Sequence, residues 1–127
     1  MKAAELKRLG DQYAELGDYE SAELLLRNAL SAQERELGEE HPSLSVDLYN
    51  LGLLCYALDK FNDAETFLMR AWAIERKCFG PMHSDTLATL EALSELYYDA
   101  NRNTSIEFKA LAITAARSNY GTVHLHH

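Results

Sequence analysis

Residues that interrupt helices are scarce in this chain, which has two prolines and six glycines among 127 residues. Ala, Leu and Glu are abundant instead, and this composition favours helix over sheet. Two cysteines are too few for a disulfide framework and fit a reducing cytosol. No run of about 18 apolar residues occurs, and the first residues lack the apolar stretch of a signal peptide. These absences favour an all-helical, cytoplasmic protein without a membrane span.

Basic residues are also in deficit, with 12 Lys and Arg against 20 Asp and Glu and a formal net charge of −8. Such a surface repels a phosphate backbone, so nucleic-acid binding is not expected. A basic or apolar partner suits this surface better. The hydrophobic share of 47% is enough for a core. The length suits a single domain, which is either a compact unit or a piece of a longer array.

The chain aligns with itself when it is shifted by 42 residues. Leu9-Gly10 then falls on Leu51-Gly52, and Gly38-x-x-His41 falls on Gly80-x-x-His83. The pattern returns once more as Gly121-x-x-His124, at an offset of 41 from the second copy. Self-similarity at a fixed period of this length is the signature of a stacked repeat.

Each repeat reads as two helices joined by a short turn. The turns are "GD" at 17–18 and "DK" at 59–60. Gly10 and Gly52 lie inside predicted helices, where they are expected to let the two helices of a pair approach closely. Apolar residues recur at helical spacing in the first helices (Leu6, Leu9, Tyr13, Leu16; Leu44, Leu48, Leu51, Cys55, Leu58) and in the second helices (Tyr19, Ala22, Leu26, Ala29; Phe61, Ala64, Leu68, Ala71).

The repeated histidines could form a metal site, a catalytic array or a structural joint. Stacked helix pairs place equivalent positions on the order of 10 Å apart, whereas two nitrogens on one zinc ion lie within about 4 Å. We therefore expect no metal and predict that His41, His83 and His124 close the joints between repeats. Gly38 and Gly80 are expected to adopt the left-handed conformation that ends a helix. The oxygens predicted to cap the next helix belong to Ser43, Ser84 and Asp85.

The pattern L-G-x-x-Y followed by G-x-Y/F-x-x-A-x-x-x-L-x-x-A resembles the tetratricopeptide repeat. The 42-residue period and the "LGEEHPS" joint resemble the variant found in kinesin light chains, over about residues 3–100. The resemblance implies a right-handed solenoid of three antiparallel helix pairs. A single domain 1–127 would then contain repeats at about 3–42, 43–84 and 85–121 and a tail at 122–127, whose final histidines are native or remain from a tag.

The third repeat departs from the pattern. Gly52 is replaced by Ser94, and "ANRNTS" replaces the "GDYESA" turn. "KALAI" at 109–113 still resembles "RAWAI" at 70–74, but at an offset of 39. Terminal repeats are often atypical because one face meets water. The third pair is therefore either a cap or the point at which a further repeat is missing.

The resemblance implies that the first helix of each pair lines a concave groove that binds an extended peptide or a partner helix. Asn50 matches the asparagine that contacts the peptide backbone in kinesin-light-chain-like repeats, and the partner should carry an apolar anchor and a basic flank. The lysine and asparagine set that clamps a terminal carboxylate in some relatives is absent. The positions proposed for the groove are Lys7, Arg8, Asp11, Tyr49, Asn50, Leu53, Tyr56, Glu91, Glu95 and Tyr98, with Ala4, Val46, Ala88 and Ala92 beside them.

The sequence shows no acid–base couple, no glycine-rich phosphate loop and no G-x-S-x-G motif, so neither an enzyme nor a cofactor is expected. Cys55 takes the place of Tyr13 in the repeat and is expected in the core, too far from Cys78 to pair with it. Two alternatives to peptide binding remain open. The chain could be an internal segment of a longer solenoid with a structural role, or a module that self-associates through its end helices.

Overall fold

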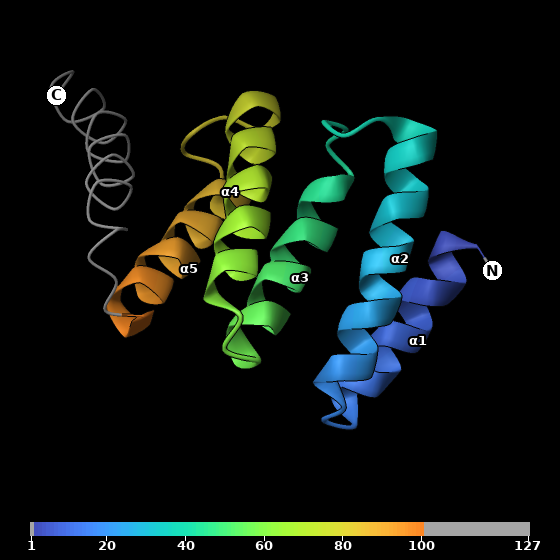
Figure 1. Cartoon of the computed structure of the whole chain (residues 1–127). Helices are drawn as coiled ribbons and strands as arrows, with labels where there is room; N and C mark the ends of the chain where they lie inside the picture. Colours follow the sequence, from blue (N-terminus) through green and yellow to red (C-terminus); the bar gives the residue numbers. More distant parts are fainter. Residues whose placement is uncertain (1, 101–127) are drawn as a thin grey trace, which may run out of the picture.

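The computed structural model describes residues 2–100 of the chain, and within them the regular structure is entirely helical (Figure 1). Five helices follow one another with short connections, as the repeat predicts. Their bounds are α1 Ala3–Glu15, α2 Tyr19–Leu37, α3 Leu44–Ala57, α4 Phe61–Cys78 and α5 Ser84–Ala100. No helix in this part of the chain is long and apolar enough to cross a bilayer.

The helices form two rows. α1 packs on α2 and α3 packs on α4 as antiparallel pairs, and α5 packs on α4 and also contacts α3. α1, α3 and α5 therefore make one row, while α2 and α4 make the other (Figure 1). Two of the three predicted pairs are complete. The second helix expected for the third pair, like His124 and the tail, lies outside the described residues.

The core is centred on the α3/α4 pair, which has neighbours on both sides. Leu48, Leu51 and Leu68 are fully buried, and Leu93 and Leu96 of α5 join them. The apolar face of α1 is less buried, because Tyr13 is 40% exposed and Leu16 is 80% exposed. α1 contacts only α2 extensively, so the same apolar spacing is left half covered at this end.

The close approach predicted at the helical glycines is confirmed. A Cβ atom on Gly52 would lie 2.6 Å from Cγ of Leu68, and one on Gly10 would lie 2.8 Å from Cγ of Leu26. Such distances are far inside van der Waals contact, so only glycine fits without movement. The turn between paired helices is also as predicted, with positive φ angles of 83° at Gly17 and 60° at Asp59.

The joints between repeats differ in detail from the prediction. Gly38 has a positive φ of 89°, but its ψ of 159° is extended, so the left-handed helical conformation expected there was wrong. Ser43 does not cap α3, because its Oγ lies 2.8 Å from Nδ1 of His41 instead. His41 Nδ1 also accepts the backbone N–H of Ser43 at 3.2 Å. The imidazole thus binds the residue that precedes α3, and no side chain caps the helix.

The second joint repeats this use of histidine. His83 Nδ1 accepts the backbone N–H of Asp85 at 3.1 Å, at the start of α5. The ring of His83 lies 5.0 Å from that of Phe79, and Thr86 donates to the carbonyl of Gly80 at 2.8 Å. These contacts support the structural role proposed for the two histidines. The equivalent His124 is outside the described residues.

A buried ion network joins α2 to the α3/α4 pair. Glu23 is 6% exposed and accepts hydrogen bonds from Arg27 at 2.8 Å and from Lys60 at 2.6 Å, while Arg27 also reaches Asp63 at 2.9 Å. Burial acts to raise the pKa of Glu23, but the hydrogen bonds from Lys60 and Arg27 outweigh it and hold the pKa below its ordinary value. The network ties the first repeat to the second.

The cysteines lie as predicted. Cys55 is fully buried, Cys78 is exposed, and both are free thiols. Burial raises the pKa of Cys55 to about 11, which keeps the thiol protonated and unreactive. Glu34 of α2 is only partly exposed and pairs with Arg70 of α4 at 2.9 Å.

Candidate functional site

Three hollows open along the row formed by α1, α3 and α5. Their volumes are about 270, 190 and 470 Å³. Asn50, near the middle of α3, lines all three of them. The hollows therefore adjoin one another around a single side chain, and we call the surface that they share the groove. Its walls come from α1, α3 and α5, and α2 and α4 contribute residues that lie deeper, such as Leu26 and Glu75.

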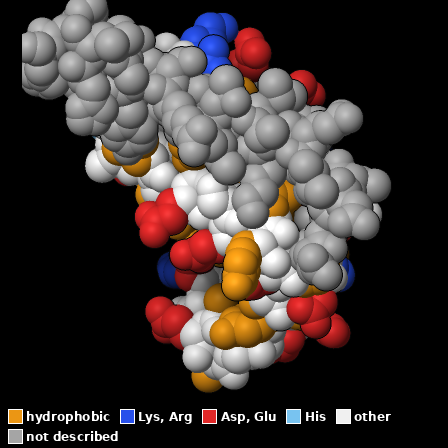
Figure 2. All heavy atoms as spheres, turned by 90° about the vertical axis from the view of Figure 1, so that its left-hand side faces the viewer, with side chains coloured by type: hydrophobic (Ala, Val, Ile, Leu, Met, Phe, Trp, Pro, Cys, Tyr) orange, Lys and Arg blue, Asp and Glu red, His pale blue; other side chains and the backbone are white. Residues whose placement is uncertain are grey.

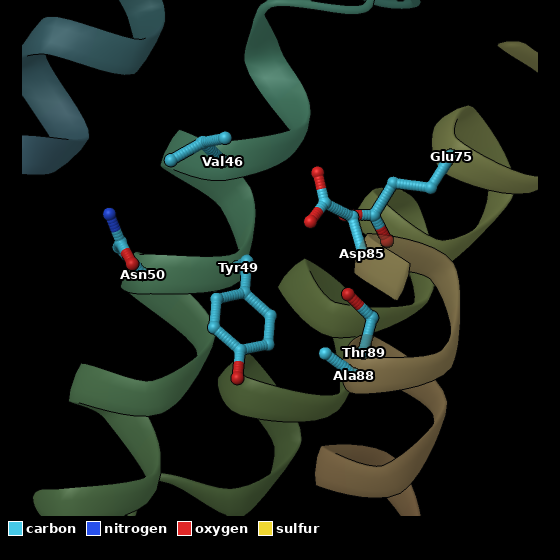
Figure 3. Close-up of a pocket in the computed structure, with 7 residues that line it drawn as sticks. All are labelled: Val46, Tyr49, Asn50, Glu75, Asp85, Ala88 and Thr89. Carbon is cyan, nitrogen blue, oxygen red and sulfur yellow. The ribbon is translucent and has the colours of Figure 1, made fainter. Parts of the chain in front are cut away.

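The first hollow lies between α3 and α5 and is called here the Glu75 hollow (Figure 3). Figure 3 shows Glu75 reaching from α4 toward Asp85 and Thr89 of α5, with Val46 and Tyr49 of α3 on the opposite side. Two carboxylates thus face an aromatic and an aliphatic side chain. The complete lining is Val46, Tyr49, Asn50, Glu75, Asp85, Ala88 and Thr89, and none of these residues is basic.

Glu75 is 2% exposed, yet its Oε1 finds no hydrogen-bond partner among the described residues, and neither does the buried Oγ1 of Thr89. Burial raises the pKa of Glu75 to about 7, and the carboxylate of Asp85 adds to this rise. The Thr89 hydroxyl acts in the opposite direction, although it makes no hydrogen bond of regular geometry with the carboxylate. A buried carboxylate oxygen without a partner is unusual, because its desolvation is not compensated.

The second hollow, between α1 and α3, contains an ion pair, although Oδ2 of Asp47 has no hydrogen-bond partner among the described residues. Lys7 of α1 pairs with Asp47 of α3 at 3.0 Å across the gap. The third hollow is larger and more apolar, with Leu26, Leu53, Leu54 and Ala57 among its lining residues. The groove therefore offers an apolar region near α1 and a negatively charged, unpaired region near α5.

The structure brings half of the predicted groove residues together. Lys7, Asp11, Tyr49, Asn50 and Leu53 all line hollows of the groove. The other proposed positions line none of them: Arg8, Glu91, Glu95 and Tyr98 are exposed, and Tyr56 stacks edge-to-face on Phe61 with ring centroids 6.0 Å apart. Of the neighbouring positions, Ala92 was wrongly placed at the surface, because it is only 7% exposed and belongs to the core.

Sequence reasoning missed Glu75, Asp85 and Thr89, although the repeat holds a signal for them. At an offset of 42, Glu75 is equivalent to Gln33, Thr89 to Asp47, and Tyr49 to Lys7. We call the contact between α1 and α3 the first junction and that between α3 and α5 the second junction. The second junction thus has the acid Glu75 in place of the amide Gln33, and the aromatic ring of Tyr49 in place of the cation Lys7. Among the described residues, no group of three or more His, Cys, Asp and Glu is arranged to hold a metal ion.

Comparison with known sequences places the fold in a family. Residues 2–77 match the sequence model of the tetratricopeptide repeat. The chain belongs to the tetratricopeptide repeat family. Proteins of this family commonly act as protein–protein interaction scaffolds and are generally not enzymes. No curated protein matches the chain.

Solved structures show the same solenoid. A crystal structure of a putative kinesin light chain with nearly identical TPR-like repeats from Podosopora anserina has a TM-score of 0.80 at 22% identity, covering 94% of this tetratricopeptide repeat chain and 56% of that one. A single-substitution variant of that protein has a TM-score of 0.66 at 23% identity, with 93% and 56% covered. BtubC (BKLC) from P. vanneervenii has a TM-score of 0.76 at 20% identity, with 92% and 46% covered. The chain thus spans about half the length of the solved structures that it matches.

Proposed function

We propose that the chain binds an extended segment of a partner protein in the groove along α1, α3 and α5. The observation that carries this proposal is the position of Asn50, which lines all three hollows of the groove. An asparagine side chain has both donors and an acceptor, so it can hydrogen-bond the backbone of a segment that crosses it without regard to the sequence of that segment.

The residues around Asn50 supply the other parts of an interface. Tyr49 and Leu53 are one helical turn apart and offer apolar surface for an anchor residue. Aromatic and aliphatic anchors usually dominate the free energy of binding. Lys7, Arg8 and Asp11 lie on the equivalent helix of the first pair and would contact the flanking residues of the same segment.

The preference for a basic flank rests on charge. Glu91 and Glu95 are exposed and four residues apart on α5, so they share one face of the helix. Seen from the α5 side, the described surface shows acidic side chains beside hydrophobic ones and few basic ones (Figure 2). Exposed carboxylates of this kind raise the association rate for a basic partner more than the affinity. Tyr56 and Tyr98 would extend the apolar wall at the far end of α3 and α5.

The proposal is tested by selecting peptides from a displayed random library on the immobilised full chain and measuring their affinities by titration. Tyr49→Ala combined with Asn50→Ala should weaken a selected peptide at least about tenfold at any salt concentration. Asn28→Ala, on the exposed surface of α2, is the matched control and should change nothing. If the control weakens binding and the groove variant does not, the peptide binds the second row of helices and the proposal is wrong.

Charge reversal tests the flank separately. Glu91→Lys combined with Glu95→Lys should weaken a basic peptide mainly at low salt, since screening is already strong at about 0.15 M. An equal loss at low and high salt would show that these carboxylates make direct contacts instead of acting at a distance.

One observation favours a second candidate, a structural role in a longer or self-associated array. Leu16 and Leu24, in the first helix pair, are 80% and 64% exposed. Apolar side chains in this position are what a further repeat or a second copy would cover. Light scattering after size exclusion tests the self-association. A dimer that becomes a monomer when Leu16→Ser is combined with Leu24→Ser supports self-association through this surface. A wild-type protein that is already monomeric argues against it.

A further inference from the structure

We propose that the Glu75 hollow receives a basic side chain of the bound segment, held between the carboxylates of Glu75 and Asp85 and the ring of Tyr49. This inference rests on the proposed function, because it assigns one pocket of the same groove to one type of residue. It goes beyond the basic flank attributed to the exposed Glu91 and Glu95, since it names a buried contact that determines specificity.

The comparison of the two junctions points to a missing cation. In the first junction, Lys7 pairs with Asp47, and Gln33 is neutral at the position equivalent to Glu75. In the second junction, the equivalents are Tyr49, Thr89 and Glu75, and Asp85 stands where the first has Ser43. These positions thus hold one cation and one anion in the first junction, against two carboxylates and no cation in the second.

The burial of the polar groups is the second, independent observation. Glu75 and Thr89 are 2% and 0% exposed, and each has a side-chain oxygen without a hydrogen-bond partner in the described part of the chain. Both line the hollow, and Figure 3 shows Glu75 directed toward Asp85 and Thr89. Native proteins pair nearly all such atoms. Gln33 and Asp47, the equivalents in the first junction, also have one unpaired side-chain oxygen each, but Lys7 already supplies a cation there, whereas the lining of the Glu75 hollow has none.

A basic side chain supplies what the hollow lacks. A guanidinium carries five N–H donors and an ammonium carries three, enough to serve Glu75, Asp85 and the Thr89 hydroxyl together. The long aliphatic stem of Lys or Arg can lie against Val46 and Ala88, which are also in the lining. The Tyr49 ring is also in the lining and can contact the cation. An acidic or apolar side chain would leave the same oxygens unpaired.

Selection on two forms of the full chain tests the proposal. The displayed random library is enriched in parallel on the wild type and on Glu75→Gln, which keeps the size of the side chain and removes the charge. We expect wild-type peptides to share Lys or Arg at one fixed distance from an apolar anchor. Peptides from Glu75→Gln should keep the anchor and lose the basic residue. Circular dichroism confirms that the variant is folded.

A cycle of four titrations then measures the contact. One selected peptide is made with its basic residue and with citrulline, a neutral analogue of arginine, and each is titrated against the wild type and Glu75→Gln. The charged peptide should bind the variant about tenfold more weakly, and the citrulline peptide should bind both equally. Glu36→Gln, an exposed carboxylate on α2 outside the groove, is the matched control and should leave both affinities unchanged.

The pH dependence adds a signature that a structural role of Glu75 would not produce. The cation binds the ionised form of Glu75, whose pKa lies at about 7, so the affinity of the charged peptide should rise as the pH increases through that value. Asp85 on α5 and Tyr49 on α3 are the other titratable groups of the hollow, and the imidazole of His83 lies just before α5. The same pH titration of Glu75→Gln measures the contribution of these other groups, and the affinity of the charged peptide for this variant should not rise near pH 7.

The outcomes separate this inference from the proposed function. If peptides are selected and depend on Tyr49 and Asn50 but show no basic position that depends on Glu75, the groove binds peptides and this inference is overturned. It is likewise overturned if Glu75→Gln weakens the citrulline peptide as much as the charged one. If no selected peptide depends on Tyr49 or Asn50, the proposed function fails, and this inference fails with it.

Discussion

Two buried glutamates on α2 and α4, in the same row of the solenoid, are treated in opposite ways. Glu23 of α2 accepts hydrogen bonds from Lys60 and Arg27, and its pKa is held below the ordinary value despite burial. Glu75 of α4 is at least as buried, has no basic residue in its hollow, and has its pKa raised to about 7. The first carboxylate is part of the structure that joins the repeats. The second has an oxygen without a hydrogen-bond partner among the described residues and lines the hollow to which we assign a basic side chain.

The difference shows how a repeat protein can separate stability from recognition. A buried carboxylate stabilises a joint only when cations and hydrogen bonds offset its desolvation. The network around Glu23 meets that condition and connects helices of successive pairs. The Glu75 hollow does not, so it lowers the stability of the free protein, and a cation from a partner would recover that loss on binding.

The largest expected effect comes from removing the charge of Glu75. Its native pKa of about 7 exceeds the ordinary 4.5, so its contribution to stability is present below about pH 4.5 and is lost as the pH rises through 7. Glu75→Gln should therefore match the wild type near pH 4 and exceed it at about pH 8 by on the order of 3 kcal/mol. Urea melts at both pH values measure this. A variant that is less stable than the wild type at the higher pH would show that the carboxylate is satisfied after all.

Disruption of the closed interior should act in the other direction. Gly52→Leu would place a side chain against Leu68, since even a Cβ would lie 2.6 Å from its Cγ, and should destabilise the protein by about 1–3 kcal/mol. Leucine is the better helix former, so propensity alone predicts a gain. Ala73→Leu, at an exposed position of α4, is the control in urea melts. Equal stability of both variants would mean that α3 and α4 can separate at no cost.

Glu23→Gln should have a smaller effect of the same sign as Gly52→Leu. The loss of two charge-assisted hydrogen bonds predicts about 1–2 kcal/mol at neutral pH, less than for a fully buried pair because Arg27 and Lys60 are partly exposed. The pKa of Glu23 is lowered, so this stabilisation is present above about pH 4.5 and disappears as the pH falls through the native pKa. Melts at neutral pH and at about pH 3 check both statements. A gain at neutral pH would erase the contrast between the two glutamates.

The smallest change in stability is expected for a variant that makes the two junctions alike. Tyr49→Lys places in the second junction the cation that Lys7 provides in the first, and its effect on stability should be under about 1 kcal/mol. Its main effect should be on Glu75, whose pKa should fall from about 7 toward the ordinary value. Carboxyl NMR titration reads that pKa directly, with Tyr49→Met as the uncharged control. An unchanged pKa would show that position 49 does not face the carboxylate.

The sequence predicted what depends on the period of the repeat. Gly52 could be placed against the second helix because its small size recurs at an offset of 42, and the turn at Asp59 follows from the same alignment. Asn50 was placed in the groove by the resemblance alone. Gly52 and Asp59 are fixed by contacts within one helix pair, and Asn50 is fixed by the family pattern. Features of this kind can be predicted wherever the sequence pattern of the repeat is present.

The features that were missed depend on several elements at once. Ser43 has the right chemistry for a cap, but the neighbouring His41 competes for its hydroxyl. Glu75 reads as one more surface carboxylate until the packing of α5 buries it and the absence of a basic residue from its hollow is seen. A comparison of equivalent positions, Lys7 with Tyr49 and Gln33 with Glu75, could have indicated the hollow, although not its burial.

The most direct test of groove binding is a map of where a selected peptide contacts the protein. Backbone amide shifts of the isotope-labelled full chain are recorded during titration with a library-selected basic peptide. We predict that the largest shifts occur in the groove, at Tyr49, Asn50, Asp85 and Ala88. Shifts concentrated on the exposed surfaces of α2 and α4, around Asn28 and Ala73, with none at Tyr49 and Asn50, would contradict binding in the groove.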